Sequence, residues 1–181
     1  AQTGNIVLLS QHIFAGNWAD VMRYLMPVLS FMFGVAAATE IRQHFQNIGR
    51  IHWRQIVILI EMSMLFLVGF LPGKMDLVAN AFVSFSCAMQ VQTFRKVDSY
   101  AFASTMCIGN IRSGMEALCA YRQSHNRQIL YKAFHYFGII ILFAFGAGIG
   151  SILIPVFNLQ TIWFSSFLLM VGFFLMFIQE K

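Results

Sequence analysis

The sequence predicts an all-α membrane protein, a polytopic helical bundle made of two inverted-topology three-span repeats of which the first is truncated. Three observations lead to this fold class. Of the 181 residues, 59% are hydrophobic and only 10% are charged, with a mean hydropathy of +0.70, whereas soluble domains carry about 25% charged residues. The apolar runs have lengths that suit a bilayer. Short sequence matches recur at a nearly constant offset along the chain.

The apolar runs give the expected spans in order. About 20 apolar residues cross a bilayer core, and the runs of comparable or greater length cover residues 21–40, 56–71, 77–112, 133–157 and 159–178. Residues 1–10 are expected to end a further helix. Polar stretches at 11–20, 41–55 and 113–132 are expected to connect the helices.

Small residues four positions apart indicate where helices pack closely. Gly34 and Ala38 form such a pair in the first span, and Gly146 and Gly150 form another near the C-terminus. Pro27, inside the first span, is tolerable there because neighbouring helices can satisfy the backbone groups that it frees.

The run at residues 77–112 carries a charged break. Charge is costly inside a bilayer, and the break comprises Arg95, Lys96 and Asp98. If this run crosses once as a broken span, one side receives eight basic residues, namely Arg42, Arg50, Arg54, Arg112, Arg122, Arg127, Lys132 and Lys181. The other side receives only Arg23 and Lys74. Two separate crossings would leave no such bias, so one broken span is favoured, with the first side and the C-terminus cytoplasmic.

Three short matches indicate an internal repeat. They lie in the same order at offsets of 103 to 105 residues and pair Gly4-Asn5-Ile6 with Gly109-Asn110-Ile111, Phe33-Gly34 with Phe137-Gly138, and Val68-Gly69-Phe70 with Val171-Gly172-Phe173. The single membrane domain then divides into a first repeat, residues 1–75, and a second, residues 76–181. Three-span repeats must have inverted topology. The partner of residues 77–104 would precede residue 1, so the first repeat is expected to lack its first span; coincidence among Gly- and Phe-rich helices is the alternative.

The central run also resembles a known family. Its segments NAFVSFSCAMQVQTFRK and ASTMCIGN are similar to the N-A-x-V-x-F-x-x-G-x-Q-N-x-x-x-R pattern of the YoaK-like family of uncharacterised bacterial multi-pass inner-membrane proteins, a domain of unknown function. The positions that match this family include Thr3, Gly4, Asn5, Glu61, Asn80, Ser84, Phe85, Gln90 and Arg95. Ala88 departs from the pattern by replacing its usual Gly. The resemblance covers essentially the whole chain and implies a multi-pass inner-membrane protein without an established activity.

Glu61 is the strongest single candidate for a functional residue. It lies inside an apolar run, seven residues after Arg54, which is about 10 Å at 1.5 Å per helical residue. An ionised carboxylate at that depth is costly, so it should be protonated, paired or facing a polar cavity. Two interpretations stand. Glu61 is a proton-coupling or cation-binding carboxylate, or it has a structural role, in which it pairs with Arg54, Arg95 or a nearby hydroxyl or reaches the membrane interface.

A second set of candidates consists of uncharged polar residues. Asn80, Ser84 and Gln92 lie near one stripe of a helix, which suits either a solute path or interhelical hydrogen bonds. Asn5 and Asn110 are related by the repeat. Their half-helices could present backbone ends to a ligand, as broken helices do in transporters; a Gly-Asn packing or turn motif is the alternative.

The sequence contains no pattern that indicates an enzyme. The histidines lack metal-ligand spacing, the three cysteines form no C-x-x-C motif, and the G-x-S-x-G, P-loop and H-E-x-x-H motifs are missing. We therefore expect no enzyme, no cofactor, no metal site and no nucleic-acid partner. The net charge of +5 is assigned to basic cytoplasmic loops that face anionic lipids of the bilayer.

The expected function is that of a small secondary-transporter-like or channel-like protein for a small solute or ion, in the bacterial inner (plasma) membrane. The alternative is a non-transporting membrane interaction or assembly subunit, for which the packing motifs and the polar stripe suffice. A chain of this length is small for enclosing a path alone, which favours a homodimer.

Overall fold

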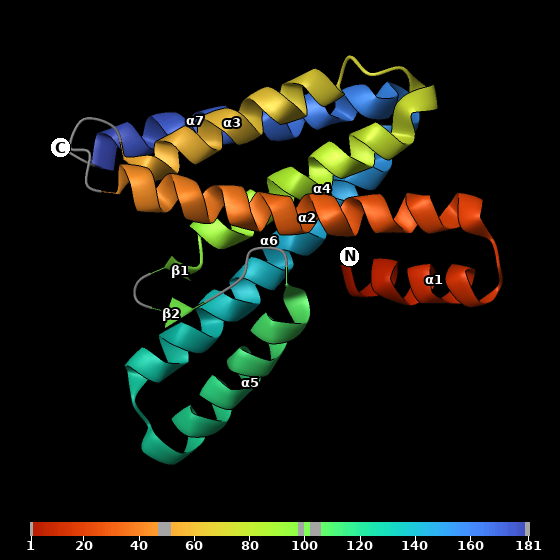
Figure 1. The fold of residues 1–181 in the computed structure, drawn as a ribbon. Coiled ribbons are helices and arrows are strands. Elements are labelled where there is room, and N and C mark those ends of the chain that lie inside the picture. The colour runs from red at the N-terminus through yellow and green to blue at the C-terminus, as the bar shows by residue number, and fades with distance from the viewer. Residues whose placement is uncertain (1, 47–51, 98–99, 102–105, 180–181) are drawn as a thin grey trace. The chain divides into compact units, whose positions relative to one another are not determined.

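The computed structural model describes residues 2–46, 52–97, 100–101 and 106–179. Its helices are α1 (Gln2–Phe14), α2 (Trp18–Phe45), α3 (Trp53–Val68), α4 (Asp76–Thr93), α5 (Cys107–Ser124), α6 (Arg127–Phe157) and α7 (Ile162–Gln179) (Figure 1). Two short 3-10 helices, η1 (Gly73–Met75) and η2 (Asn158–Thr161), precede α4 and α7. The strands β1 (Lys96–Val97) and β2 (Tyr100–Ala101) have two residues each and pair antiparallel. The prediction of a helical protein is confirmed.

The chain forms two compact units. Unit 1 comprises Ala1–Thr93 and Phe157–Lys181, and unit 2 comprises Phe94–Val156. This division follows from contacts within each unit and does not test the repeat, so the predicted repeats, residues 1–75 and 76–181, stay a prediction.

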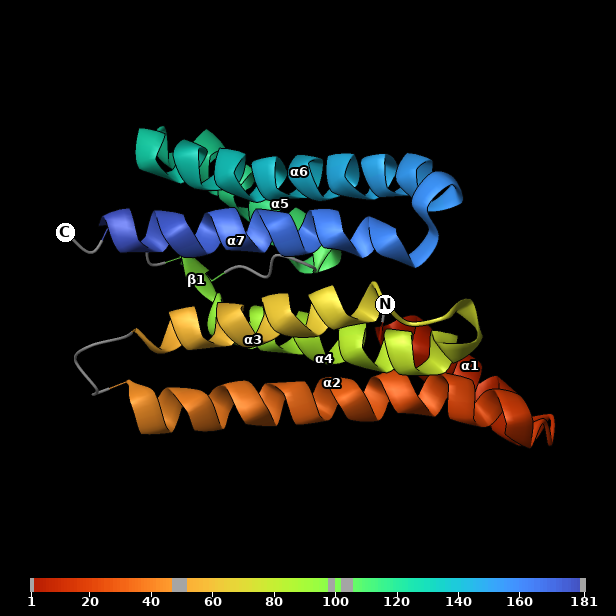
Figure 2. The ribbon, with the colours of Figure 1, turned by 90° about the horizontal axis from the view of Figure 1, so that it is seen from above.

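In unit 1, helix α2 packs against α4, and α3 packs against both α4 and α7 (Figure 2). Gly34 brings α2 and α4 close together, because a Cβ atom there would lie 2.5 Å from the carbonyl oxygen of Phe85 and 2.7 Å from Cβ of Ala88. Ala38, one turn further along α2, is also buried. The close packing predicted for this pair is therefore confirmed. Pro27 is buried inside α2, which continues through it.

The core of unit 1 gathers at the end where α2 stops and α3 starts. Its buried cluster consists of Ala38, Trp53, Val57 and Met89. The first turn of α3 is capped by His52, whose Nδ1 accepts a hydrogen bond from the Arg54 N–H (3.2 Å). In return, the His52 N–H donates to Oε1 of Gln55 (3.2 Å). This reciprocal capping satisfies backbone donors that a helix start leaves free.

Helix α7 is fixed to α3 by polar contacts with backbone carbonyl groups. The indole Nε1–H of Trp163 donates to the carbonyl of Phe66 (3.1 Å), and the hydroxyl of Ser166 donates to the carbonyl of Met62 (3.1 Å). Gly69 makes room for the indole ring, which a Cβ atom at that position would overlap.

Unit 2 contains the largest departure from the predicted elements. Residues 113–132 were expected to be a polar connection, but α5 extends to Ser124 and α6 begins at Arg127. The prediction was wrong because polarity does not exclude a helix: α5 buries Gly114 and Ala117 on one side. On its exposed side, Nε of Arg112 donates to Oε1 of Glu116 (2.8 Å), a pair spaced for helix stabilisation.

Two other predicted breaks fare differently. The expected connection at 11–20 is shorter than predicted, since α1 reaches Phe14 and α2 starts at Trp18, with Gly16 at a φ of 70° between them. At the predicted charged break, α4 stops at Thr93 and Arg95 is exposed after it. Lys96 lies in β1, whereas Asp98 lies outside the described residues.

Two helical stretches of the described chain are long and apolar enough to cross a membrane. They are Trp18–Phe45 and Arg127–Met176, the second of which contains α6 and most of α7. A Cβ atom added at Gly146 or Gly150 would have no atom of another described helix within 4 Å. The close helix packing predicted for that pair is therefore not found in the described part of the chain.

Candidate functional site

The candidate site is centred on the carboxyl group of Glu61, on the buried side of α3. Only 1% of Glu61 is exposed. It shares one stripe of the helix with Val57 and Val68, which are also buried, because these positions recur at helical spacing. No described donor forms a hydrogen bond with Oε1 of Glu61. Glu61 is thus a buried acid with an unsatisfied oxygen.

The helices that pack against α3 are α4 and α7, and α4 carries two further polar side chains of interest. The thiol of Cys87 lies close enough to interact electrostatically with Glu61. The neighbouring Ser86 is buried, and its hydroxyl also lacks a hydrogen-bond partner among the described residues. Two unsatisfied polar side chains therefore lie on the two contacting helices, and each leaves a hydrogen-bonding position open.

The charge of Glu61 has no direct counter-charge in the described chain. No described Lys, Arg or His nitrogen lies within 4.0 Å of its carboxylate oxygens, and the ion pairs that the structure does show involve other carboxylates. A direct pair with Arg54 or Arg95, which is one form of the structural role drawn from the sequence, is therefore not seen. Burying an unpaired carboxylate is expensive, so the group is stable there as the neutral acid or with a bound cation.

The predicted polar stripe of α4 does not face Glu61 as a set. Nε2 of Gln92 donates to the hydroxyl of Thr39 on α2 (3.0 Å), and that hydroxyl donates to the carbonyl of Val35 (2.8 Å). Ser84 is half-buried and Asn80 is exposed. Gln92 therefore joins α4 to α2, which is the interhelical hydrogen bond that was the alternative to a solute path.

The two repeat-related asparagines lie in different units. Nδ2 of Asn5 donates to Oε1 of Gln2 one turn earlier in α1 (3.0 Å). Asn110 is buried in the first turn of α5. Their expected meeting at a ligand stays a prediction.

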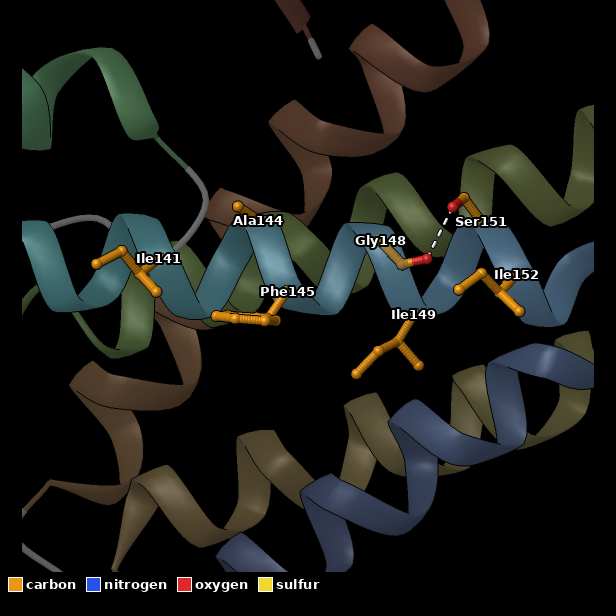
Figure 3. A pocket seen from close by; sticks show the side chains of 7 residues that line it. All are labelled: Ile141, Ala144, Phe145, Gly148, Ile149, Ser151 and Ile152. Atoms are coloured by element: carbon orange, nitrogen blue, oxygen red, sulfur yellow. Dashed lines mark hydrogen bonds between the residues drawn. The ribbon is translucent and has the colours of Figure 1, made fainter.

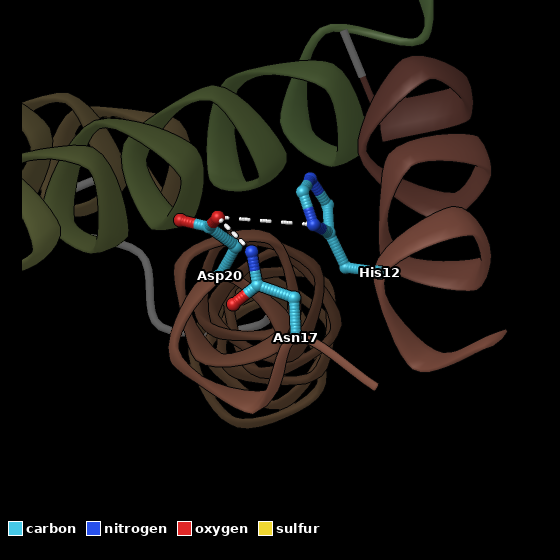
Figure 4. Close-up of polar contacts among 3 residues, drawn as sticks. All are labelled: His12, Asn17 and Asp20. Atoms are coloured by element: carbon cyan, nitrogen blue, oxygen red, sulfur yellow. Dashed lines mark hydrogen bonds and ion pairs between the residues drawn. The ribbon is translucent and has the colours of Figure 1, made fainter. Parts of the chain in front are cut away.

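Two features outside the site were not expected from the sequence. The first is a polar corner between α1 and α2, where Nδ1 of His12 lies 3.8 Å from Oδ2 of Asp20 and Nδ2 of Asn17 donates to the same oxygen (2.7 Å) (Figure 4). The ring of His12 also stacks on Tyr24, with centroids 5.3 Å apart. These contacts hold α1 against α2 at their connection.

The second feature is a shallow groove along α6. It is lined almost wholly by apolar side chains, among them Ile141, Phe145, Ile149 and Ile152 (Figure 3). Its hydroxyl group, on Ser151, already donates to the carbonyl of Gly148 (2.7 Å). The groove therefore offers a polar ligand little to bind.

Sequence reasoning identified Glu61 but missed its neighbours. Ser86 was not among the candidates, and Cys87 was considered only as one of three cysteines that form no C-x-x-C motif. The spacing of small residues in the sequence could have indicated Ser86. Ala79, Ser86 and Thr93 recur every seven residues, which puts two hydroxyl groups on one buried side of α4.

The fold and the site together define a helical protein with a buried, unpaired carboxyl group between two packed helices. The chain belongs to the family described as a protein of unknown function (DUF1275), whose pattern matches residues 1–175. No curated protein and no solved structure matches the chain.

Proposed function

We propose that this chain is a multi-pass protein of the bacterial inner membrane, of the YoaK-like kind, and that it moves a small solute or ion as a secondary-transporter-like or channel-like protein. The observation that carries the proposal is Glu61, buried to 1% exposure with an unsatisfied oxygen. Uncompensated carboxyl groups inside membrane helices are rare, and they mark ion paths and proton relays.

The exposed surface supports the membrane location. None of the most apolar window of Arg127–Met176 is buried, and Leu142 and Ile152 on α6 are each 72% exposed. Water does not favour a continuous apolar surface of this kind, whereas lipid tails cover it without cost. The surplus of basic residues on one predicted side then makes that side and the C-terminus cytoplasmic.

The proposed mechanism places the coupling step between α3 and α4. Glu61 takes up a proton or a cation when the contact opens to one side, and it releases this ion when the contact opens to the other. The hydroxyl of Ser86 and the thiol of Cys87 supply the nearby polar groups of the open site. Two inverted repeats would provide the two alternately opened arrangements, as they do in many secondary transporters.

The second candidate is a non-transporting interaction or assembly subunit of the membrane. The hydrogen bond between Gln92 and Thr39 and the close approach at Gly34 favour it, because both are explained by helix packing alone. In either case we propose a homodimer, no enzymatic activity and no cofactor, with anionic lipids at the basic cytoplasmic loops.

A flux screen separates the two candidates. The full chain is reconstituted into proteoliposomes that contain an entrapped pH-sensitive dye, and an inward pH gradient is imposed with a panel of sugars, amino acids, organic acids and inorganic ions outside. A transporter or channel dissipates the gradient, or accumulates one class of solute, faster than protein-free liposomes. An interaction subunit leaves every rate at the protein-free value, which would reject the transport proposal.

A further inference from the structure

At the end of unit 1 where α2 stops and α3 starts, two cations lie against the same aromatic ring. Trp53, the first residue of α3, is only 8% exposed and belongs to the buried core cluster. The guanidinium carbon of Arg42 lies 5.8 Å from the centroid of this ring, and that of Arg54 lies 5.2 Å from it. The ring therefore holds two side chains from different helices at one place.

Neither guanidinium group is neutralised within the described chain. The described ion pairs of unit 1 use His12 with Asp20 and His44 with Glu40, and none includes Arg42 or Arg54. Contact with the face of an aromatic ring positions a cation but leaves its net charge in place. Each guanidinium lies within 5.8 Å of the same ring centroid, so the field of both charges favours an anion at this end of unit 1.

The chemistry of the two side chains points to a phosphate group. A guanidinium presents a planar set of donors that matches phosphate oxygens and remains charged at every physiological pH. The backbone of the α3 first turn contributes less, because the Arg54 N–H is already bonded to His52. The two side chains, rather than the helix start, would therefore hold the anion.

We propose that Arg42 and Arg54, positioned by Trp53, bind the phosphate of an anionic lipid headgroup. The proposal rests on the membrane location argued above, which puts the ends of α2 and α3 at the level of the headgroups. Tryptophan is enriched at that level, and basic residues there attract anionic lipids. Arg42 is exposed and Arg54 is half-buried, so both are open to a headgroup from outside.

The test is lipid binding to the full purified chain in a neutral detergent, followed by native mass spectrometry during titration with phosphatidylglycerol. The variant Arg42→Gln/Arg54→Gln should weaken binding about thirtyfold, since each of the two basic residues contributes on the order of 1 kcal/mol to anionic-lipid attraction. The matched control Arg122→Gln/Arg127→Gln removes the same charge elsewhere on the predicted basic side. It should weaken binding clearly less than Arg42→Gln/Arg54→Gln, because the described aromatic rings position neither of these two arginines. Arg42→Lys/Arg54→Lys keeps the charge but loses the planar donors, and it should fall between the wild type and the Gln variant.

Several results would overturn the proposal. An equal loss of lipid affinity in the two Gln variants would show diffuse electrostatic attraction without a defined site. An unchanged lipid affinity of Arg42→Gln/Arg54→Gln would reject the proposed site. Displacement of the lipid by millimolar inorganic phosphate would identify free phosphate as the occupant instead. If Arg42→Gln/Arg54→Gln fails to fold, Arg42→Lys/Arg54→Lys provides the test. A lipid affinity equal to that of the wild type in this variant would contradict a role for the planar guanidinium donors. Lipid binding is measured without transport. Its result can therefore be interpreted even if the protein proves not to transport a solute.

Discussion

Glu61 on α3 and Ser86 on α4 are buried on two helices that pack together, and each has a side-chain oxygen without a hydrogen-bond partner among the described residues. None of the described ion pairs includes Glu61. Such an acid is held in place by packing and not by a salt bridge. Its protonation state can therefore change without breaking an ion pair, which is the property that a coupling site needs.

The contact of α2 with α4 predicts that Gly34 tolerates no side chain. Gly34→Ala places a Cβ atom 2.5 Å from the carbonyl oxygen of Phe85. Because that neighbour is backbone and cannot turn aside, the variant should lose about 1–3 kcal/mol of stability. Thermal unfolding in detergent would show this. Gly138→Ala is the matched control, since a Cβ atom there would meet no described atom within 4 Å apart from its own stretch of helix, and it should be neutral or stabilising by up to about 1 kcal/mol. Equal stability of the two variants would contradict the packing described for Gly34.

The hydrogen bond from Gln92 to Thr39 predicts a measurable coupling between α4 and α2. Gln92→Leu and Thr39→Val each remove it, and a double-mutant cycle of unfolding free energies should give a coupling of about 0.6–1.7 kcal/mol, the range for such bonds between membrane helices. Asn80→Leu, at an exposed position of the same helix, should show no coupling to Thr39→Val. A coupling near zero for the Gln92 pair, with flux lost in Gln92→Leu, would instead favour the solute path predicted from the sequence.

The charge bias predicts the orientation of the chain. In a background with the three native cysteines replaced by Ser, a membrane-impermeant maleimide added to intact cells should label Lys74→Cys. It should fail to label Arg50→Cys until the membrane is permeabilised, because position 50, outside the described residues, belongs to the basic side. Labelling of position 50 in intact cells would reverse the orientation.

The positions of the helices could be predicted from the sequence more fully than the packing of one helix against another. The apolar runs of the sequence located α2, α6 and α7. A long apolar stretch such as Trp18–Phe45 can be identified from hydropathy alone, without knowledge of its tertiary contacts. Helix α5 was missed since its stability comes from a narrow buried side and an exposed ion pair between Arg112 and Glu116, which a hydropathy profile does not register.

The same limit applies to the site. Glu61 stands out in an apolar run by its charge alone. Ser86 becomes a buried hydroxyl without a described partner only when α4 packs against its neighbouring helices, and the sequence does not show that packing. The two arginines at Trp53 are likewise separated by the turn between two helices and become neighbours only in the fold.

The central claim is that Glu61 is a coupling carboxyl group, and the most direct test is pH-dependent flux of Glu61→Gln in proteoliposomes. The substitution keeps the shape of the side chain and removes its titration. Because no described cation pairs with Glu61, the variant should fold with near-normal stability; a structural ion pair would instead cost about 3–5 kcal/mol when broken. Glu40→Gln is the matched control, since Glu40 is an exposed carboxylate of the same unit, paired with His44 at 3.8 Å.

The account predicts that Glu61→Gln unfolds within a few degrees of the wild type and loses the pH dependence of flux, while Glu40→Gln keeps it. A folded Glu61→Gln variant with the same pH-dependent flux as the wild type would contradict the claim.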